Sequence, residues 1–270
     1  SYTAGYGFKH MGDPSGLVRV KIYNMNIQVK TTAAWNGGQA PNMSLEMHGG
    51  RFEEVQVYAC TLNMNVSLVG KNEYTGSAYS IRFHHNQLLT EEGYGIETST
   101  SHLIIDSNYI YLKTGGDGAF HDYGGGEVPG WTDISIHHNY IYNCRWRPIM
   151  FSAPVSKFRF YNITVEWFPD AAWVVYVAEL SNTPKDDWII QNNIFYRPPI
   201  GASAIDAPTD DQAIANIIIR NNLLYASNDD QSLCTPGHSA IIKEQDNIVT
   251  HDWEAPHFVD MGNPKVADLS

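Results

Sequence analysis

The sequence predicts an all-β solenoid of about nine coils with three short strands in each coil. Three observations support this prediction. A residue pattern recurs along the chain, an asparagine occupies a fixed place in most of its copies, and alternating apolar residues flank that place. A chemical motif is normally unique in a chain, whereas a structural device repeats, so the recurrence indicates architecture before it indicates chemistry.

The pattern reads apolar, any, apolar, two variable residues, Asn, any, apolar. Its clearest copies are SIRFHHNQLLT (80–90), LIIDSNYIYLK (103–113), DISIHHNYIYNCRW (133–146), WIIQNNIFYR (188–197) and IIIRNNLLYAS (217–227). With weaker copies included, the anchor residues are Met25, Cys60, Asn86, Asn108, Asn139, Ile163, Asn193, Asn222 and Asn247. Their spacing varies from 22 to 35 residues, which excludes strict repeats such as propellers and suits a solenoid with variable loops.

Each copy predicts a short strand, a bend and a second short strand, because apolar residues alternate on both sides of the anchor. Asparagine tolerates the left-handed backbone region better than other non-glycine residues, so we expect the anchor itself to form the bend. Its amide suits bonding to the same group in the next coil. We therefore expect Asn86, Asn108, Asn139, Asn193 and Asn222 to stack in one column.

A third strand is expected upstream of most copies, where another short run of apolar character lies. These runs are SLEMHG (44–49), GYGIETS (93–99), DGAFHDYGG (117–125), RPIMFSA (147–153), VVYVAE (174–179) and ASAIDA (202–207). Three parallel strands per coil result.

With these features, the chain resembles the right-handed, single-stranded parallel β-helix proteins of the pectin-lyase-like superfamily. The resemblance extends from about residue 17 to residue 260. That superfamily contains polysaccharide lyases, glycoside hydrolases, esterases, epimerases and phage tailspikes, so it implies a fold and a polysaccharide or oligosaccharide partner more than one reaction. It also implies a secreted or periplasmic protein.

The uninterrupted repeat predicts one elongated domain over residues 1–270. The N-terminal segment leads almost directly into the first coil without the usual cap, as it would in a fragment of a longer chain. No apolar run approaches the roughly 20 residues of a membrane span, and no signal peptide is present. A net charge of −12 disfavours nucleic acid, and disfavours an acidic glycan unless calcium or a local cationic cluster intervenes. Cys60, at an anchor position, is expected to be a buried free thiol.

The candidate catalytic residues lie on the first strands of the middle coils, where neighbouring coils stack outward residues into rows. Glu97, Asp122 and Asp206 supply carboxylates, and Arg147 is the expected cationic partner. Asp122 is the favoured acid because it lies in the long glycine-rich segment KTGGDGAFHDYGGGEVPGW (113–131). Carboxylates stacked about 5 Å apart do not all stay ionised at low cost, so one of them should keep its proton.

Substrate-binding candidates surround these residues. They are His121, Lys113, Arg145, Trp131, Trp146 and Glu179. Arg145 and Arg147 lie two apart on one side of an extended segment, which suits a carboxylate ligand, although in so acidic a protein pairing with the acidic rows of neighbouring coils is the better interpretation. Trp188 aligns with a core position. The tandem histidines at 84–85 and 137–138 occupy variable positions of the repeat, so we expect them neither to bind a metal nor to catalyse.

Three functions remain open at this point. A glycoside hydrolase would use a carboxylate pair on neighbouring coils. A polysaccharide lyase would use Lys113 or an arginine as base, with calcium or Arg145 and Arg147 stabilising the developing charge on a uronate. A noncatalytic glycan-binding or structural solenoid would need neither. The hydrolase is the leading prediction, with no cofactor assigned.

Overall fold

The computed structural model describes residues 5–11, 17–28, 42–48, 51–63, 65–70, 80–90, 94–98, 100–112, 118–122, 130–144, 147–151, 154–167, 175–176, 185–196, 205–206, 214–225 and 242–250. All secondary-structure elements in these ranges are β-strands, and all strand pairs are parallel. The predicted all-β fold is therefore confirmed. Among these residues there is no helix that is long and apolar enough to cross a membrane.

The strands form three parallel sheets, which we call A, B and C. Sheet A contains β1 (Gly5–Met11), β4 (Asn42–His48), β7 (Asn65–Gly70), β10 (Tyr94–Thr98), β13 (Gly118–Asp122), β16 (Arg147–Met150), β19 (Val175–Tyr176) and β22 (Ile205–Asp206). Sheet B contains β2 (Leu17–Tyr23), β5 (Arg51–Tyr58), β8 (Ile81–His84), β11 (Leu103–Asp106), β14 (Trp131–His137), β17 (Val155–Tyr161), β20 (Lys185–Gln191), β23 (Ile214–Arg220) and β25 (Ile242–Gln245). Sheet C contains β3 (Asn26–Ile27), β6 (Thr61–Leu62), β9 (Gln87–Thr90), β12 (Tyr109–Leu112), β15 (Tyr140–Cys144), β18 (Thr164–Trp167), β21 (Ile194–Tyr196), β24 (Leu223–Tyr225) and β26 (Ile248–Thr250).

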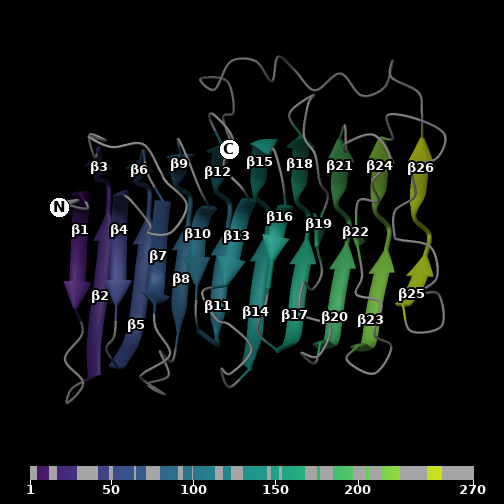
Figure 1. Ribbon diagram of the computed structural model, residues 1–270, viewed down its shortest axis with the longest axis horizontal. Helices are drawn as coiled ribbons and strands as arrows, with labels where there is room; N and C mark the ends of the chain where they lie inside the picture. The colour runs from purple at the N-terminus through teal and green to yellow at the C-terminus, as the bar shows by residue number, and fades with distance from the viewer. Residues whose placement is uncertain are drawn as a thin grey trace.

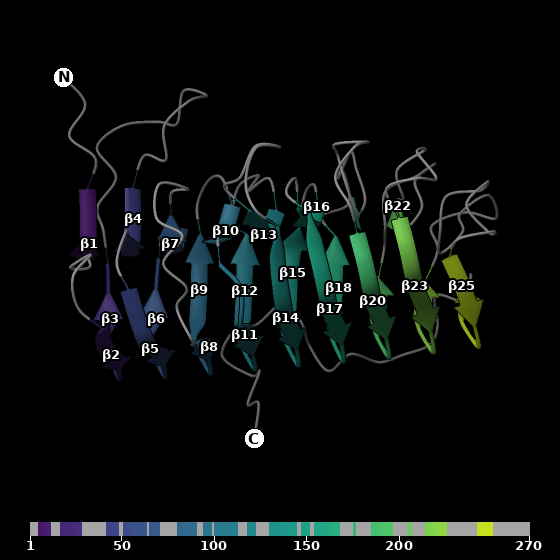
Figure 2. The ribbon, with the colours of Figure 1, turned by 90° about the horizontal axis from the view of Figure 1, so that it is seen from below.

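From β1 to β24 the strands belong to sheets A, B and C in strict rotation, and we call one such set of three a pass. Each strand pairs with the strands of the same sheet in the preceding and following passes. In Figure 1 the colours therefore change steadily along the long axis, and Figure 2 shows the same order from a second direction. The predicted first strands are confirmed in β4, β10, β13, β16, β19 and β22, whereas β1 and β7 were not anticipated.

The core lies between the sheets and consists of rows of apolar side chains in register. In sheet B the row that ends next to the bend runs through Val57, Phe83, Ile105, Ile136, Phe160, Ile190 and Ile219, all at most 1% exposed. Burial of each such side chain stabilises the fold by about 1.5–3 kcal/mol. Because strand residues alternate between faces, the residues between these core positions form rows on the outer face of the sheet.

The bend between sheets B and C has a left-handed residue, but it is not the anchor asparagine. Positive φ occurs at Asn24, Ala59, His85, Ser107, His138, Asn162, Asn192, Asn221 and Asp246, each directly before an anchor. The expectation that the anchor itself adopts this conformation was therefore wrong. The preceding side chain points outward and is free to vary, whereas the anchors from Cys60 to Asn222 are buried, and the asparagines among them must satisfy their polar groups.

The predicted asparagine column is confirmed by its hydrogen bonds. Asn108 Oδ1 accepts from the backbone N–H of Asn86 at 2.9 Å and from its side-chain amide at 3.1 Å. The same two bonds join Asn108 to Asn139, Asn193 to Asn222, and Asn222 to Asn247. Ile163 interrupts the column, although its backbone N–H still donates to Asn193 Oδ1. These bonds fix the register of neighbouring passes.

Two further expectations about the core are confirmed. Cys60 and Cys144 are buried free thiols, and Cys234 lies outside the described residues. Burial raises the pKa of Cys60, in part offset by backbone hydrogen bonds, so this thiol is poorly reactive. Trp188 is fully buried and its indole N–H donates to the Val155 carbonyl at 2.8 Å.

Candidate functional site

The outer face of sheet A carries a row of polar residues centred on Glu97. The strand register pairs Glu97 of β10 with Ser67 of β7 on one side and with His121 of β13 on the other. Ile96, the residue before Glu97, is fully buried in the core row. Glu97 and His121 therefore take the alternate, outer positions of adjacent strands, with Cα atoms about 4.8 Å apart.

Glu97 is one of two buried carboxylates among the described residues: it is 7% exposed and Asp106 of sheet B is 3% exposed, and Ser67 beside Glu97 is 6% exposed. A carboxylate is seldom withdrawn from water without a partner, since desolvation of the charge is costly. A sheltered carboxyl group next to an imidazole is an arrangement that can exchange a proton with a bound substrate.

Thr98 takes the position after Glu97 and therefore faces the core side of the sheet. Thr98 is 2% exposed, and its Oγ1 has no hydrogen-bond partner among the described residues. It pairs with Asp122 on one side and with buried Leu68 on the other. Asp122 thus lies one residue beyond the row of Glu97 and His121, in the register row that Thr98 and Leu68 share.

The structure separates the other predicted catalytic residues from Glu97. The row continues from His121 through Met150 and Tyr176 to Asp206. Asp206 is thus four strands from Glu97, or about 19 Å at 4.8 Å per strand. Arg147 pairs with Gly118, four residues before Asp122, which is about 13 Å along the strand. These two residues do not form one compact cluster with Glu97 and Asp122.

The predicted substrate-binding residues are only partly described. His121 lies beside Glu97, as given above. Trp131 begins β14 of sheet B, where it is half-buried and packs against the core, away from the row of Glu97. Four others, Lys113, Arg145, Trp146 and Glu179, lie outside the described residues.

Two residues of the row, Ser67 and Glu46, were not identified from the sequence as site candidates. Ser67 lies between Glu97 and Glu46, because β7 pairs with β10 on one side and with β4 on the other. The signal for Ser67 was available in NVSLVG (65–70), where it alternates with Val66 and Leu68. Ser67 was overlooked because the repeat alignment depended on the anchor between sheets B and C, and no anchor adjoins β7.

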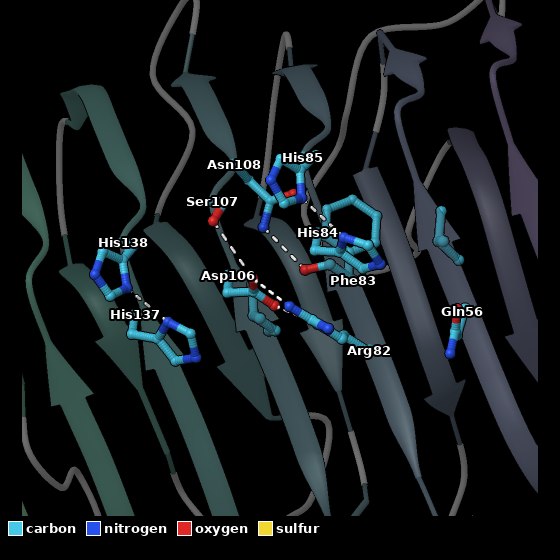
Figure 3. A network of polar contacts seen from close by, with 12 residues as sticks. Gln56, Arg82, Phe83, His84, His85, Asp106, Ser107, Asn108, His137 and His138 are labelled. Carbon is cyan, nitrogen blue, oxygen red and sulfur yellow. Dashed lines mark hydrogen bonds and ion pairs between the residues drawn. The ribbon is translucent and has the colours of Figure 1, made fainter. Parts of the chain in front are cut away.

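A second polar network lies on the outer face of sheet B, next to the bend. Arg82 binds Asp106 with two hydrogen bonds of 2.8 Å, from Nε and from a terminal nitrogen. Asp106 is only 3% exposed and also accepts a 3.4 Å contact from the Ser107 hydroxyl. Figure 3 shows Arg82 reaching across to Asp106, with a pair of histidines on either side.

The two histidine pairs have the same geometry. His84 and His137 occupy the positions in register with Asp106 on the neighbouring strands. In each pair the two Nδ1 atoms are 2.8 Å apart, His84 with His85 and His137 with His138. One ring of each pair must therefore donate through Nδ1 while the other accepts, which fixes their tautomers.

Aromatic rings extend this column on both sides. Tyr58 stacks on His84 with ring centroids 5.1 Å apart, and Tyr23 stacks on Tyr58 at 5.2 Å. On the other side Tyr161 stacks on His137 at 4.7 Å. Asp106 is thus a buried carboxylate within an otherwise aromatic column.

The ionisable groups of this network shift one another's pKa values. Burial, followed by the charge of Arg82, lowers the pKa of His84. Burial and the neighbouring His138 and Arg82 lower the pKa of His137, although Asp106 opposes the shift. Burial alone would raise the pKa of Asp106, but the hydrogen bond and charge of Arg82 outweigh it, so this pKa is lowered.

No set of three or more His, Cys, Asp or Glu side chains in the described part of the chain is arranged to hold a metal ion. That the tandem histidines bind no metal and do not catalyse stays a prediction. Comparison with protein-family models, with curated proteins and with solved structures finds no match to this chain.

Proposed function

We propose that the chain is a right-handed parallel β-helix of about nine coils, similar to the pectin-lyase-like superfamily. The strict rotation of strands among three parallel sheets supports this proposal, as does the asparagine column at one bend. On the same resemblance we propose a secreted or periplasmic protein whose partner is a polysaccharide or oligosaccharide.

We further propose that the protein cleaves glycans on the outer face of sheet A, as a glycoside hydrolase with Glu97 as the proton donor. The observation that supports this best is the sheltered carboxyl group of Glu97 beside His121 in one row. His121 is suited to orient a sugar hydroxyl or the leaving oxygen next to that carboxyl group.

A hydrolase also needs a second carboxylate, and the row offers one. Glu46 is two strands from Glu97, with Ser67 between them, so their Cα atoms are about 10 Å apart. Inverting glycosidases hold their two carboxyl groups about 6.5–9.5 Å apart, which this spacing permits. Asp122, adjacent to Thr98, is the alternative partner.

The row favours hydrolysis over β-elimination. From Glu46 to Asp206 its members are Glu46, Ser67, Glu97, His121, Met150, Tyr176 and Asp206. A lyase needs a cation beside the acidic sugar to stabilise the developing charge. In the described row the nearest lysine or arginine to Glu97 is Lys9 of β1, which pairs with Glu46 and is three strands away.

The test is a screen of neutral and uronate-containing polysaccharides, read by reducing ends and by ultraviolet absorbance. A hydrolase produces reducing ends without absorbance, whereas a lyase produces both. On a substrate that the wild type cuts, Glu97→Gln should lower kcat by about 10³-fold or more, since it removes the proton and keeps the shape. The matched control is Glu166→Gln, a carboxylate on sheet C that accepts a hydrogen bond from Tyr140.

Three further variants identify the second carboxylate. Glu46→Gln, Asp122→Asn and Asp206→Asn each remove one charge, and only the true partner should match the loss in Glu97→Gln. A loss confined to Asp206→Asn would contradict the site, because Asp206 is four strands away. Full activity of Glu97→Gln would overturn the proposed function.

A further inference from the structure

The outer face of sheet B carries a row in which four of nine residues are basic, although they are far apart in the sequence. In register, this row contains Lys21, Gln56, Arg82, Ile104, Ser135, Arg159, Ile189, Ile218 and Lys243. Basic side chains occur in it without a single acidic one, although the chain as a whole has a net charge of −12. Residues from distant segments are brought together because each pass contributes one member.

The neighbouring outer row contains the histidines of the second network. Its members are Tyr23, Tyr58, His84, Asp106, His137, Tyr161, Gln191, Arg220 and Gln245. Asp106 is the one acid of this row, and Arg82 neutralises it. Asp187 offsets Arg159 through hydrogen bonds of 2.9 Å, and Glu54 lies 3.8 Å from Lys21. At neutral pH the centre of this face is thus close to neutral.

Acidification changes this balance while keeping the bond within each pair, although in the second pair it places a proton on His138 Nε2, opposite the Asn162 amide nitrogen 3.0 Å away. Each histidine pair can take up one proton and keep its Nδ1 hydrogen bond, because the protonated ring donates and the neutral ring accepts. The two pairs flank Asp106 one strand away on either side, so two added protons fall on one small area. Groups facing them from the packed strands are Tyr58, Arg82, His102, Asp106, Asp133, Arg159 and Tyr161.

The spacing of the basic residues indicates what kind of polyanion would fit. Arg82, Arg159 and Lys243 recur every third strand, about 14 Å apart. The net charge of −12 opposes any polyanion, and it opposes duplex DNA, with one charge per ~1.7 Å, more strongly than a polymer with fewer charges. A flexible polymer with fewer charges, rich in hydroxyl groups, suits a face of arginine, histidine, tyrosine and glutamine side chains.

We propose that the outer face of sheet B binds an acidic polysaccharide, lying along the long axis over Arg82, His84 and His137, and that it does so at mildly acidic pH. This binding surface is separate from the row of Glu97 on sheet A. Binding at this surface does not require cleavage, so its test is independent of the test of the proposed hydrolase.

The test measures binding of polygalacturonate to the full chain by calorimetry at about pH 5 and about pH 7.5, in the Glu97→Gln background so that the polymer stays intact. Binding should be about tenfold tighter at the lower pH, as expected for two added charges close to the ligand. A neutral galactan should not bind. Chondroitin sulfate distinguishes a preference for sulfate from one for carboxylate.

Two variants locate the site. The first is the double variant His84→Gln, His137→Gln. Glutamine is the residue type that the same row carries at Gln191. This variant should abolish the increase in affinity for polygalacturonate at the lower pH. Tyr23→Gln, on the exposed end of the row, is the matched control and should keep it. Asp106→Asn removes the one acid of the row, so in a protein that circular dichroism shows to be folded, binding should tighten at both pH values.

Three outcomes would overturn the proposal. The first is equal binding at the two pH values. The second is an unchanged pH dependence in the double histidine variant. The third is tighter binding of duplex DNA or of anionic lipid vesicles than of polygalacturonate, which would identify a general anion-attracting face. Weaker binding by folded Asp106→Asn would show that the site takes a cation instead.

Discussion

At the scale of single residues, the anchor position shows how one side chain fixes the register of the solenoid. Asn108 is fully buried, and its amide donates to the Phe83 carbonyl at 3.0 Å and to Asn139 Oδ1 at 2.9 Å. Its oxygen accepts twice from Asn86. An apolar residue is tolerated at the same position in Ile163, because only one backbone bond to Asn193 has to be kept. The Asn108 side chain therefore makes four hydrogen bonds, whereas Ile163, which also lies between two asparagines, keeps only its backbone bond.

This difference predicts the outcome of a matched pair of substitutions. Asn108→Ile leaves buried donors of Asn86 and the Phe83 carbonyl unsatisfied, so it should lower the free energy of unfolding by about 3 kcal/mol or more. Ile163→Asn places an amide between Asn139 and Asn193, where partners exist on both sides, and should cost about 1 kcal/mol or less. Chemical denaturation of both variants measures the difference. Equal losses would show that the column is not held by its side-chain bonds.

At the scale of elements, the sequence predicted where strands occur better than which residues face one another. The apolar alternation beside each anchor located sheets B and C, because buried side chains there must recur at every second position. Glu97 and His121 could be named from the sequence, but their pairing could not, since loops of unequal length hide the register. The basic row of sheet B was missed for the same reason, as its members are at least 22 residues apart.

Sheet B also predicts how stability depends on pH. The folded-state pKa values of His84 and His137 are lowered, so as pH falls below about 6.5, the ordinary value, the unfolded chain binds more protons than the folded one. Stability should therefore decline with acidification. The lowered pKa of Asp106 acts in the same direction at still lower pH, because its ion pair is lost once it is protonated.

The measurement is the Tm at about pH 7.5 and about pH 5 in the absence of ligand. The wild type should melt at a lower temperature at the lower pH, and the decline should be smaller in the double variant His84→Gln, His137→Gln. Tyr23→Gln should show the full decline. An equal decline in all three proteins would place the pH dependence outside this column.

At the scale of the whole molecule, each described strand forms its ladder of hydrogen bonds with strands of the preceding and following passes, so the fold is a stack held by nearest-neighbour interfaces. In such a stack, a pass that carries no site residue contributes to stability and not to catalysis. The row itself runs through all the passes, but the residues proposed to act on the substrate, Glu46, Glu97 and His121, lie on β4, β10 and β13. Loss of one later pass should therefore shorten the molecule and leave the site intact.

Deletion of residues 193–221 tests this whole-molecule argument, because it joins Asn192 to Asn222 at the same point of the repeat. The deletion removes β21, β22 and β23, so β24 takes the place of β21 beside β18, and β25 takes the place of β23 beside β20. Core positions remain matched, since Trp188 would then face Ile242 instead of Ile217. We expect a folded, shorter protein by circular dichroism and small-angle scattering, with glycan cleavage within about tenfold of wild type, because Glu97, His121 and Glu46 are untouched. The matched deletion of residues 86–107, which joins His85 to Asn108, removes β9, β10 and β11 and with them Glu97, so it should fold and be inactive. A folded 193–221 deletion without activity would assign a catalytic role to Asp206, which that segment contains, and would move the site away from Glu97.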